Sequence, residues 1–257
     1  MEIQISDKKK KDIFVSIFQV LKNCSSLTNI TFGPEILHIQ GMDKSHICLY
    51  DVKIHKNWFA KYNVIEVIKI CLDTNVFSSI ISTKSDSQQL NIIFNNDNPD
   101  ILNILFDSTG VKGEFKKSFK MSLIDYDYEE MNIHNTEYDA ELSLSSKQIN
   151  EIFSQLNNFG DDITIECSES NVSLTTNGIA GEMKVDIPID DLSSFAIVED
   201  EEVILKYSLC YINKMCITNK LSNDIEISLS KTAPMKISYN LGDDSFMIFF
   251  IAPKMDE

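Results

Sequence analysis

The chain has 257 residues, of which 43% are hydrophobic and 24% charged, a composition typical of a globular protein and not of a disordered one. Its formal net charge is −16, and all 23 basic residues are lysines, so no arginine is present to bind phosphate or carboxylate groups bidentately. No apolar run is long enough for a membrane span, and the first residues lack the apolar stretch of a signal peptide. We therefore expect a soluble intracellular protein with no membrane partner.

Sequence motifs for catalysis and for metal binding are missing. The six cysteines are scattered singly without a CxxC pair, which predicts buried free thiols and neither a disulfide framework nor a zinc site. None of the four histidines lies in an HExxH motif, and no phosphate-binding glycine loop or nucleophile motif occurs. Acidic pairs such as Asp161-Asp162 and Asp243-Asp244 could hold a divalent cation, but their position between apolar alternations indicates turns. We expect no enzyme activity, no catalytic residue, no metal site and no cofactor.

The predicted elements, taken in chain order, form two similar halves. An apolar helical face at residues 10–23 is followed by strand-like segments at 27–32, 35–40 and 47–54. A short helix at 75–83 then precedes strands at 89–94 and 100–106. The same order returns with a helix at 146–158, strands at 162–167, 171–176 and 182–189, a helix at 207–217, and strands at 224–230, 235–241 and 245–252. The acidic, irregular segment 123–137 between the halves is predicted to be a linker. The sequence therefore indicates an internally duplicated α+β chain with antiparallel sheets.

Three segments resemble a known family. LHIQGMDKSHICL (37–49) resembles the LQ-x-MD-x-SHV-x-L segment of eukaryotic proliferating cell nuclear antigen (PCNA), and IAPKMDE (251–257) resembles the acidic C-terminal tail of that family. LIDYDYEEMNIHNTEY (123–138) lies where the family has its interdomain connector loop, and the resemblance runs nearly from end to end. It implies a DNA-clamp fold with an N-terminal domain at 1–122, a connector at 123–138 and a C-terminal domain at 139–257. It also implies that three chains form a ring-shaped homotrimer.

The function that this resemblance implies is that of a DNA polymerase processivity factor, or sliding clamp. Such a ring encircles double-stranded DNA without reading its sequence, is placed there by a clamp loader, and tethers polymerase and other PIP-box replication and repair proteins. The expected location is the nucleus, or a cytoplasmic replication factory if the protein is viral. An alternative of another class is a clamp-like peptide-binding adaptor or inhibitor that does not encircle DNA.

The resemblance also assigns sites residue by residue. A pocket under the connector would bind PIP-box peptides, and the matching positions are Met42, His46, Ile47, Met131, Ile133, His134, Tyr138, Phe250, Ile251, Ala252, Pro253 and Lys254. The trimer interface would pair edge segments 113–121 and 180–187 through Lys116, Lys117, Phe119, Lys120, Glu182, Lys184 and Asp186. Candidate phosphate contacts are Lys10, Lys11, Lys22, Lys84, Lys147, Lys214 and Lys220, although for any one of them a solvated surface lysine is an alternative interpretation.

Several positions depart from the family pattern. His134 stands where the family usually has proline and Asn132 where it often has glycine, so we expect a less rigid connector. Glu151, Ser154 and Ile217 stand where basic side chains are usual, which predicts weak attraction of DNA. Glu169 falls where the family carries its modified lysine, so the resemblance does not extend to ubiquitin signalling at that site.

Overall fold

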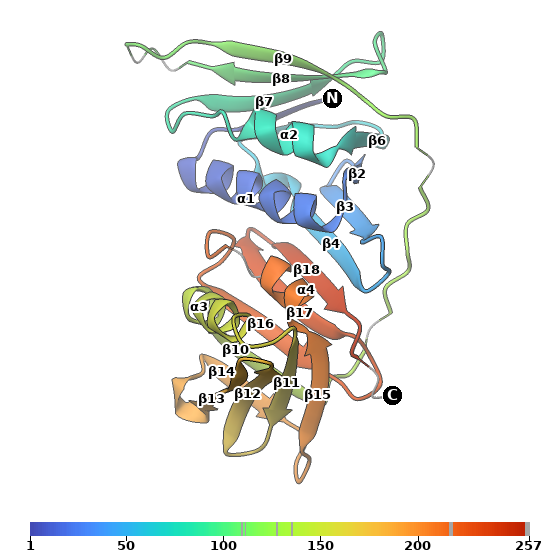
Figure 1. Ribbon diagram of the computed structural model, residues 1–257. Helices are drawn as coiled ribbons and strands as arrows, with labels where there is room; N and C mark the ends of the chain where they lie inside the picture. The colour runs from blue at the N-terminus through green and yellow to red at the C-terminus, as the bar shows by residue number, and fades with distance from the viewer. Residues whose placement is uncertain (109, 111, 127, 135, 216–217, 255–257) are drawn as a thin grey trace. The chain divides into compact units, whose positions relative to one another are not determined.

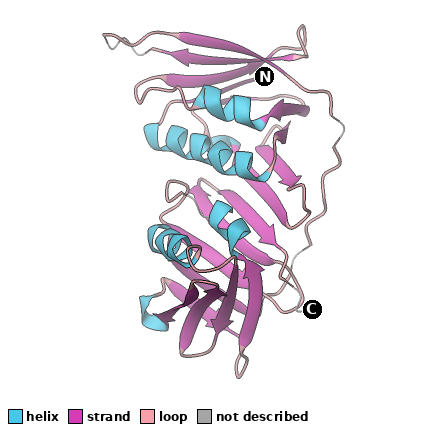
Figure 2. Cartoon of the chain, in the orientation of Figure 1, coloured by secondary structure: helices cyan, strands magenta, loops and turns pink. Residues whose placement is uncertain are grey.

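Two compact units make up the chain, and each contains segments that are distant in the sequence. The computed structural model describes residues 1–108, 110, 112–126, 128–134, 136–215 and 218–254 (Figures 1 and 2). The first unit comprises Met1–Gly41, Asp51–Met131 and Leu241–Met247, and the second comprises Met42–Tyr50, Asn132–Asn240 and the chain from Ile248 onward. This division is not linear in sequence, and the expected domain limits at residues 122 and 138 stay a prediction.

The N-terminal half of the chain supplies two short helices and nine strands. The helices are α1 (Lys8–Cys24) and α2 (Thr74–Ile81), with a single 3₁₀ turn at Lys56–Trp58. The strands are β1 (Glu2–Ile5), β2 (Leu27–Phe32), β3 (Ile36–Met42), β4 (Cys48–His55), β5 (Lys61–Asn63), β6 (Ile68–Asp73), β7 (Gln89–Phe94), β8 (Ile101–Asp107) and β9 (Lys117–Ser122). They form a sheet of order β5-β1-β7-β8-β9 and a series of neighbours β4-β3-β2-β6, and every register that the structure describes is antiparallel.

The C-terminal half repeats this plan. Its helices are α3 (Ser146–Leu156) and α4 (Leu209–Met215), with a 3₁₀ turn at Ile189–Asp191. Its strands are β10 (Ala140–Ser145), β11 (Asp162–Cys167), β12 (Asn171–Gly178), β13 (Gly181–Pro188), β14 (Ser194–Ile197), β15 (Val203–Ser208), β16 (Asp224–Leu229), β17 (Met235–Gly242) and β18 (Ser245–Ile251). One sheet has the order β13-β12-β11-β15, and β14-β10-β16-β17-β18 are the other neighbours. The predicted α+β class and the duplicated plan are confirmed.

Helix α1 forms because its sequence supplies both a cap and an apolar face. The side chain of Asp7 accepts a hydrogen bond from the N–H of Lys10 at 2.8 Å, which satisfies one of the open donors of the first turn. The predicted apolar face is buried, and Phe14 and Phe18 pack with Phe77 of α2 at ring-centroid distances of 6.4 and 4.6 Å. Buried aromatic pairs of this kind contribute about 0.5–1.5 kcal/mol beyond the area they remove from water. Figure 1 shows α1 and α2 side by side in the first unit.

The second unit uses the same kind of core. Ile149, Phe153 and Leu156 of α3 are 0–1% exposed, which confirms the apolar face predicted for this helix. In α4 the side chains of Leu209, Ile212 and Met215 are buried, and the carbonyl of Met215 accepts a hydrogen bond from the hydroxyl of Tyr239 at 3.1 Å. The helix is therefore tied to β17 by both packing and hydrogen bonding.

The structure differs from the sequence-based expectation in the segment 207–217 and in strands β1, β5, β6, β10 and β14, which were not assigned. The segment 207–217 was expected to be one helix, but Tyr207 and Ser208 end strand β15, and α4 begins only at Leu209. Tyr207 is fully buried within a run of alternating exposure, so the two-residue period of the strand prevails there over the helical one. The N-terminal residues 2–5 were not assigned to any element, yet they form β1 between β5 and β7.

The segment 123–138 is irregular, as predicted. Within its described part the backbone makes one isolated antiparallel bridge, between Ile124 and Cys71. The pair Asp243-Asp244 lies in the turn between β17 and β18, with φ of 50° and 55°, which confirms the turn interpretation for this acidic pair.

Three further features concern the described residues as a set. No helix among them is long and apolar enough to cross a membrane. No group of three or more histidine, cysteine or acidic side chains there is placed to hold a metal ion. Cys24, Cys48, Cys71 and Cys167 are buried and Cys210 is exposed, whereas Cys216 lies outside the described residues.

Candidate partner-binding site

The turn between β3 and β4 is built around a buried carboxylate. Asp43 is 7% exposed, and its Oδ1 accepts hydrogen bonds from the N–H groups of Ile47 at 2.8 Å and Cys48 at 2.7 Å. Its Oδ2 accepts from the N–H of Ser45 at 2.9 Å. An aspartate that binds the N–H groups of following residues in this way organises a tight turn. The turn therefore takes its shape from one side chain.

A residue with left-handed backbone completes this turn. His46 has a φ of 56°, and its N–H donates to the carbonyl of Asp43 at 3.1 Å. Its side chain is exposed, with Nδ1 3.1 Å from the sulfur of Met42. The predicted pair Met42 and His46 is thus brought together beside the half-buried Ile47.

Helix α4 also reaches this carboxylate. The hydroxyl of Tyr211 donates to Oδ2 of Asp43 at 3.3 Å. Burial alone would raise the pKa of Asp43, but the N–H groups of Cys48, Ser45 and Ile47 and the Tyr211 hydroxyl together outweigh it, so the pKa lies below its usual value. The folded turn is therefore stabilised by the ionised form.

The C-terminal tail runs beside the same turn. The N–H of Ala252 donates to the carbonyl of Ile47 at 2.9 Å, and the N–H of Lys254 donates to the carbonyl of Lys206 in β15 at 2.7 Å. The ammonium of Lys254 also lies 2.5 Å from Oδ1 of Asp162. These contacts hold residues 252–254 extended between the turn and β15. Met255, Asp256 and Glu257 of the tail motif lie outside the described residues.

Most of the predicted pocket residues in the second unit keep apolar surface exposed. Half-buried side chains are Met42, Ile47, Ile133, Tyr138, Phe250, Ala252 and Pro253, while His134 and Lys254 are exposed. Ile251 differs, because alternation along β18 turns its side chain into the core, where it is fully buried. The side chain of Ile251 is therefore not available at this surface, its assignment to the partner site stays a prediction, and Phe250 presents the outward face of this strand.

The first half of the connector is fixed to the first unit by Gln40. The side-chain amide of Gln40 donates to the carbonyl of Met131 at 3.0 Å, and its oxygen accepts from the N–H of Met131 at 2.7 Å. The hydroxyl of Tyr128 donates to the same oxygen at 2.8 Å. Burial, followed by the charges of Glu130 and Asp51, raises the pKa of Tyr128 to about 12, so the hydroxyl stays a donor at neutral pH. The side chain of Gln40 thus forms with the backbone of Met131 the two hydrogen bonds that a neighbouring strand would otherwise form.

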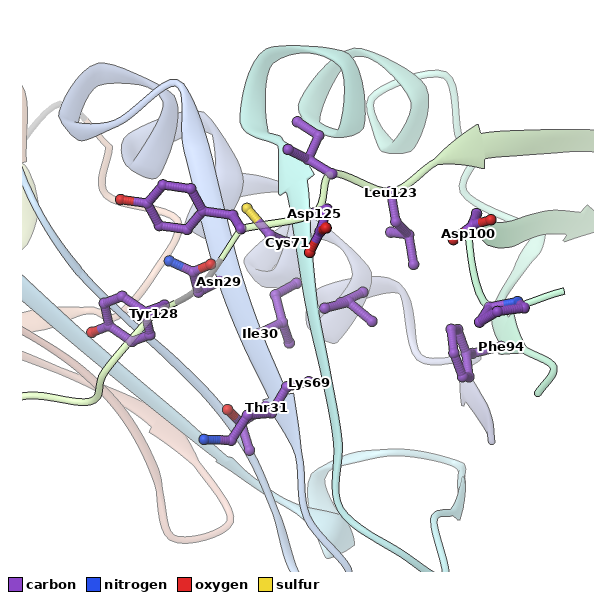
Figure 3. Close-up of a pocket in the computed structure, with 14 residues that line it drawn as sticks. Asn29, Ile30, Thr31, Lys69, Cys71, Phe94, Asp100, Leu123, Asp125 and Tyr128 are labelled. Atoms are coloured by element: carbon purple, nitrogen blue, oxygen red, sulfur yellow. The ribbon is translucent and has the colours of Figure 1, made fainter.

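A cavity of about 530 Å³ lies between this connector segment and the outer side of β2 and β6 (Figure 3). In Figure 3, Asn29 and Thr31 of β2, Lys69 and Cys71 of β6, and Tyr128 of the connector surround it. Its wall is therefore mixed, with polar side chains beside apolar ones. Sequence reasoning did not identify this cavity.

Sequence reasoning also missed the residues that shape the site without lining it. Asp43 stands inside the GMDKSH segment, and an aspartate two residues before a serine is a recognisable turn signal. Gln40 and Tyr211 carry no comparable signal, because their partners are 91 and 168 residues away in the sequence. Such contacts are visible only once the fold is known.

The candidate DNA-facing lysines fall into two groups. Lys22, Lys147, Lys214 and Lys220 are exposed, and within the described residues none of them forms an ion pair. Lys10 and Lys84 are instead neutralised, by Asp243 at 2.6 Å and by Asp12 at 2.5 Å. Their charges are already compensated within the first unit.

Lys11 is removed from the DNA-facing set. Its side chain is fully buried, and its ammonium donates to the carbonyl of Asp86 at 2.6 Å and to that of Gln88. Burial, with the nearby charge of Lys84, lowers the pKa of Lys11. The interpretation of Lys11 as a phosphate contact is therefore corrected: this lysine fastens the segment before β7 to α1.

Both segments expected at the trimer interface are edge strands. β9 is the last strand of its sheet in the first unit and β13 the last of its sheet in the second. On β13 the outward residues are Glu182, Lys184 and Asp186, and Lys184 lies 3.2 Å from Asp186. Beside β9, Lys116 lies 2.8 Å from Asp107, and Lys117 donates to the carbonyl of Thr83 at 2.5 Å. Lys120 is exposed and Phe119 half-buried.

Comparison with solved structures shows a shared fold. A chain of the crystal structure of the PCNA2–PCNA3 complex from Sulfolobus tokodaii superposes with a TM-score of 0.87. The match covers 99% of both chains at 21% sequence identity. The duplicated architecture is therefore that of this clamp protein throughout.

Curated relatives match along nearly the whole chain. Proliferating cell nuclear antigen 1 of Plasmodium falciparum is 26% identical, and the match covers 95% of this chain and 94% of the relative. The proliferating cell nuclear antigens of Saccharomyces cerevisiae and Chaetomium thermophilum are 26% and 25% identical, with 97% of each chain covered.

Family models account for both halves. Residues 5–130 match the N-terminal domain of proliferating cell nuclear antigen, and residues 132–255 match its C-terminal domain. With the duplicated fold, these matches define a DNA sliding clamp, the class of processivity factor that holds a DNA polymerase on its template. Clamps of this class are scaffolds and carry no active site. The chain belongs to the proliferating cell nuclear antigen family.

The buried carboxylate of the β3–β4 turn gives the first prediction. Asp43→Asn should lower the free energy of unfolding at pH 7 by about 1–3 kcal/mol, because one backbone N–H would then face an amide N–H₂ group in a buried site. Because the folded-state pKa of Asp43 is depressed, its contribution is complete above the unfolded value of about 3.9 and is lost as the pH falls through the folded-state pKa. Urea denaturation between pH 7 and 3 measures both effects.

Asp125→Asn is the matched control, since Asp125 is an exposed connector carboxylate. It should change the free energy of unfolding by less than about 0.5 kcal/mol. An Asp43→Asn difference that did not shrink on acidification would contradict the role given to the charge.

Proposed function

We propose that three chains close head-to-tail into a ring around duplex DNA and that the connector site recruits polymerase and other PIP-box proteins. The observation that carries this proposal is that β9 in the first unit and β13 in the second each stand at the edge of a sheet. An open edge presents unpaired N–H and C=O groups that template association. Pairing β9 of one chain with β13 of the next satisfies both, and repeating this heterologous contact three times closes a ring.

Side chains at the two edges support that pairing. The outward charges of β13 are Glu182, Lys184 and Asp186, of which Lys184 and Asp186 already compensate each other. Lys120 offers β9 an exposed positive charge opposite this net acidic strand. Opposite charges across an antiparallel pair contribute about 0.2–1 kcal/mol each, so they favour this pairing over a pairing of two identical edges.

A cavity beside β13 offers an apolar anchor point for the neighbouring chain. It has a volume of about 410 Å³ and lies between α3 and β13, where Leu144, Ile152 and Val185 are among the residues that line it. Phe119 of β9 is half-buried and lies 6.0 Å from the ring of Phe106, so part of its surface is available. We propose that Phe119 of one chain covers this cavity in the next.

The first test of this assembly is its mass. The wild-type protein should sediment at three times 29.3 kDa, about 88 kDa, at micromolar concentration. Lys117→Glu combined with Lys120→Glu should shift it toward monomer, because like charges would then face Glu182 and Asp186. Lys44→Glu, in the exposed β3–β4 turn, is the control and should leave the trimer intact. A wild-type protein that stays at 29.3 kDa would refute the ring.

Partner binding is proposed to use the apolar side chains that remain half-buried around the β3–β4 turn, the connector and the tail. Met42, Ile47 and Phe250 are among them, and Ala252 is held beside them by its hydrogen bond to Ile47. A short peptide turn with one aliphatic and two aromatic residues matches such a surface. Exposed His46 and His134 stand at its rim.

Calorimetric titration with a PIP-box peptide tests this site. Ile133→Ala should weaken binding by about 1–3 kcal/mol, since it truncates a half-buried apolar anchor of the connector. Thr136→Ala, three residues further along the same connector and exposed, should bind as wild type does. Equal affinities for the two variants would remove Ile133 from the site.

DNA contact is proposed to be weak and to rest on the exposed lysines Lys22, Lys147, Lys214 and Lys220. A trimer would carry a net charge of about three times −16, which repels DNA at long range. Encirclement replaces affinity, because a closed ring stays on the duplex without tight contacts. A clamp loader would then be needed to open it.

Since eukaryotic relatives of this family work in the nucleus, we propose a nuclear location, or a cytoplasmic replication factory for a viral protein, and no enzyme activity.

The DNA contact is tested by combining a salt series with primer extension. Wild-type protein should bind linear duplex weakly with a shallow salt dependence, because each phosphate neutralised adds only about 0.9 to the log–log slope. Ser154→Lys adds a positive charge on the exposed side of α3 and should steepen that slope, whereas Thr136→Lys on the connector should not.

On an end-blocked template with loader and cognate polymerase present, wild-type protein should nevertheless stimulate synthesis. Failure to stimulate there would contradict the clamp mechanism. Tight and steeply salt-dependent binding by wild type would show that another basic surface contacts DNA.

A further inference from the structure

The outer face of β3 carries a histidine between two carboxylates. His38 Nε2 lies 2.6 Å from Oδ1 of Asp51 on β4, and its Nδ1 lies 3.7 Å from Oε2 of Glu130 on the connector. The side chain of His38 is 16% exposed, that of Asp51 4% and that of Glu130 39%. The imidazole therefore links a buried carboxylate of the sheet to a partly exposed carboxylate of the connector.

Two lysines and three neutral donors surround this group. Lys53 on β4 lies 3.5 Å from Oδ2 of Asp51, and Lys69 on β6 lies 3.9 Å from Oε1 of Glu130. The hydroxyl of Thr31 on β2 donates to Oε1 of Glu130 at 3.0 Å. Gln40 on β3 donates to Asp51 at 3.4 Å. Tyr128, from the connector, adds a neutral hydroxyl beside Gln40.

Protonation of His38 changes the sign of its contact with the connector. Because Asp51 can only accept, Nε2 carries a hydrogen in either charge state. In neutral His38 the lone pair of Nδ1 then faces the carboxylate of Glu130, which is repulsive. In protonated His38 the same nitrogen carries a hydrogen toward that carboxylate, which is a charge-assisted contact. Histidine is the side chain that ordinarily changes charge between about pH 5 and 8.

We propose that His38 is a positioning residue that latches the connector in its protonated form. Glu130 precedes Met131, whose backbone Gln40 holds, and it precedes Ile133 by three residues. Gln40 and Tyr128 supply the part of this attachment that does not depend on pH. The contact between His38 and Glu130 strengthens on acidification and weakens on neutralisation, while the hydrogen bonds of Gln40 and Tyr128 persist.

The consequence for partner binding depends on the function proposed above. A connector held at residue 130 restricts the backbone that leads to Ile133, so less conformational freedom remains to be lost when a peptide binds. Mild acidification should therefore tighten peptide binding, and neutralisation should loosen it.

Hydrogen exchange of the connector amides tests the latch without any peptide. The full-length protein is measured between pH 8.0 and 5.5, and each rate is divided by the intrinsic exchange rate at that pH. For wild type, protection at residues 128–133 should rise about threefold on acidification, the size expected for a partly exposed ion pair. His38→Gln keeps a donor for Asp51 and Glu130→Gln keeps an acceptor for Thr31, and both should give a flat profile.

His134→Gln is the matched control, because His134 is an exposed histidine of the same connector. This variant should keep the wild-type profile. A flat profile in wild type, a profile that persists in both His38→Gln and Glu130→Gln, or one that disappears in His134→Gln would overturn the proposal.

Titration of a PIP-box peptide without histidine, at the same pH values, separates the latch from the binding site. The dissociation constant of wild type should fall about threefold on acidification, and that of His38→Gln should stay constant. If protection responds to pH and no peptide binds, the latch stands and the proposed partner site fails. If the peptide binds and protection does not respond, the latch fails and the partner site stands.

Discussion

The packing of a helix pair against antiparallel strands, made once in each unit, is the constraint on which the other features depend. Each helix is short and buries one apolar face, so it has no stability apart from the sheet that it covers. In the first unit Phe14 and Phe18 of α1 form an aromatic cluster with Phe77 of α2, and in the second α3 buries an aliphatic and aromatic face. Because the helices cover faces and not edges, the outer strands β9 and β13 remain open for association.

Local periodicity predicted much of this architecture, for a physical reason. Strands β2, β7 and β11 have the predicted limits because each places buried apolar side chains two residues apart between clear turns. The segment from Tyr207 was misassigned because Tyr207, Leu209 and Ile212 satisfy a strand period and then a helical period without a break. Strand β1 was missed because four residues are too few to show a period. It is held by β5 and β7, which lie far along the chain.

The candidate site could be predicted only where a side chain and the groups that it binds lie within one short sequence motif. The segment GMDKSHIC (41–48) contains Asp43 and the three N–H groups that it binds, so the turn could be located from the sequence. Lys11 shows the opposite case. In the sequence it is one of four consecutive lysines, yet its ammonium is buried against two carbonyls about 75 residues further along the chain. Charge in a sequence indicates where a cation can lie, whereas only the fold shows whether that charge is already compensated.

That distinction bears on how an acidic protein without arginine can still operate around DNA. Lys10 and Lys84 are paired with aspartates of the same unit, so the exposed members of the candidate DNA-facing set are Lys22, Lys147, Lys214 and Lys220. Isolated exposed lysines give shallow, non-specific attraction, and a shallow potential along the duplex opposes sliding less than a deep one. A closed ring that stays on the duplex because it encircles it is therefore compatible with weak lysine–phosphate contacts.

The connector is likewise attached partly by neutral groups and partly by charged groups. Its anchored end depends on neutral groups, since the side chain of Gln40 binds the backbone of Met131 and the hydroxyl of Tyr128 donates to the same side chain. Neutral hydrogen bonds of this kind are nearly independent of salt and pH, so we expect this part of the attachment to change little with either. Charged groups are added only at the next residue, where Glu130 contacts Thr31, His38 and Lys69. Because the Gln40–Met131 hydrogen bonds lie beside the proposed pH-dependent His38–Glu130 contact, the segment leading to Ile133 can become more or less mobile while the connector stays attached to the sheet.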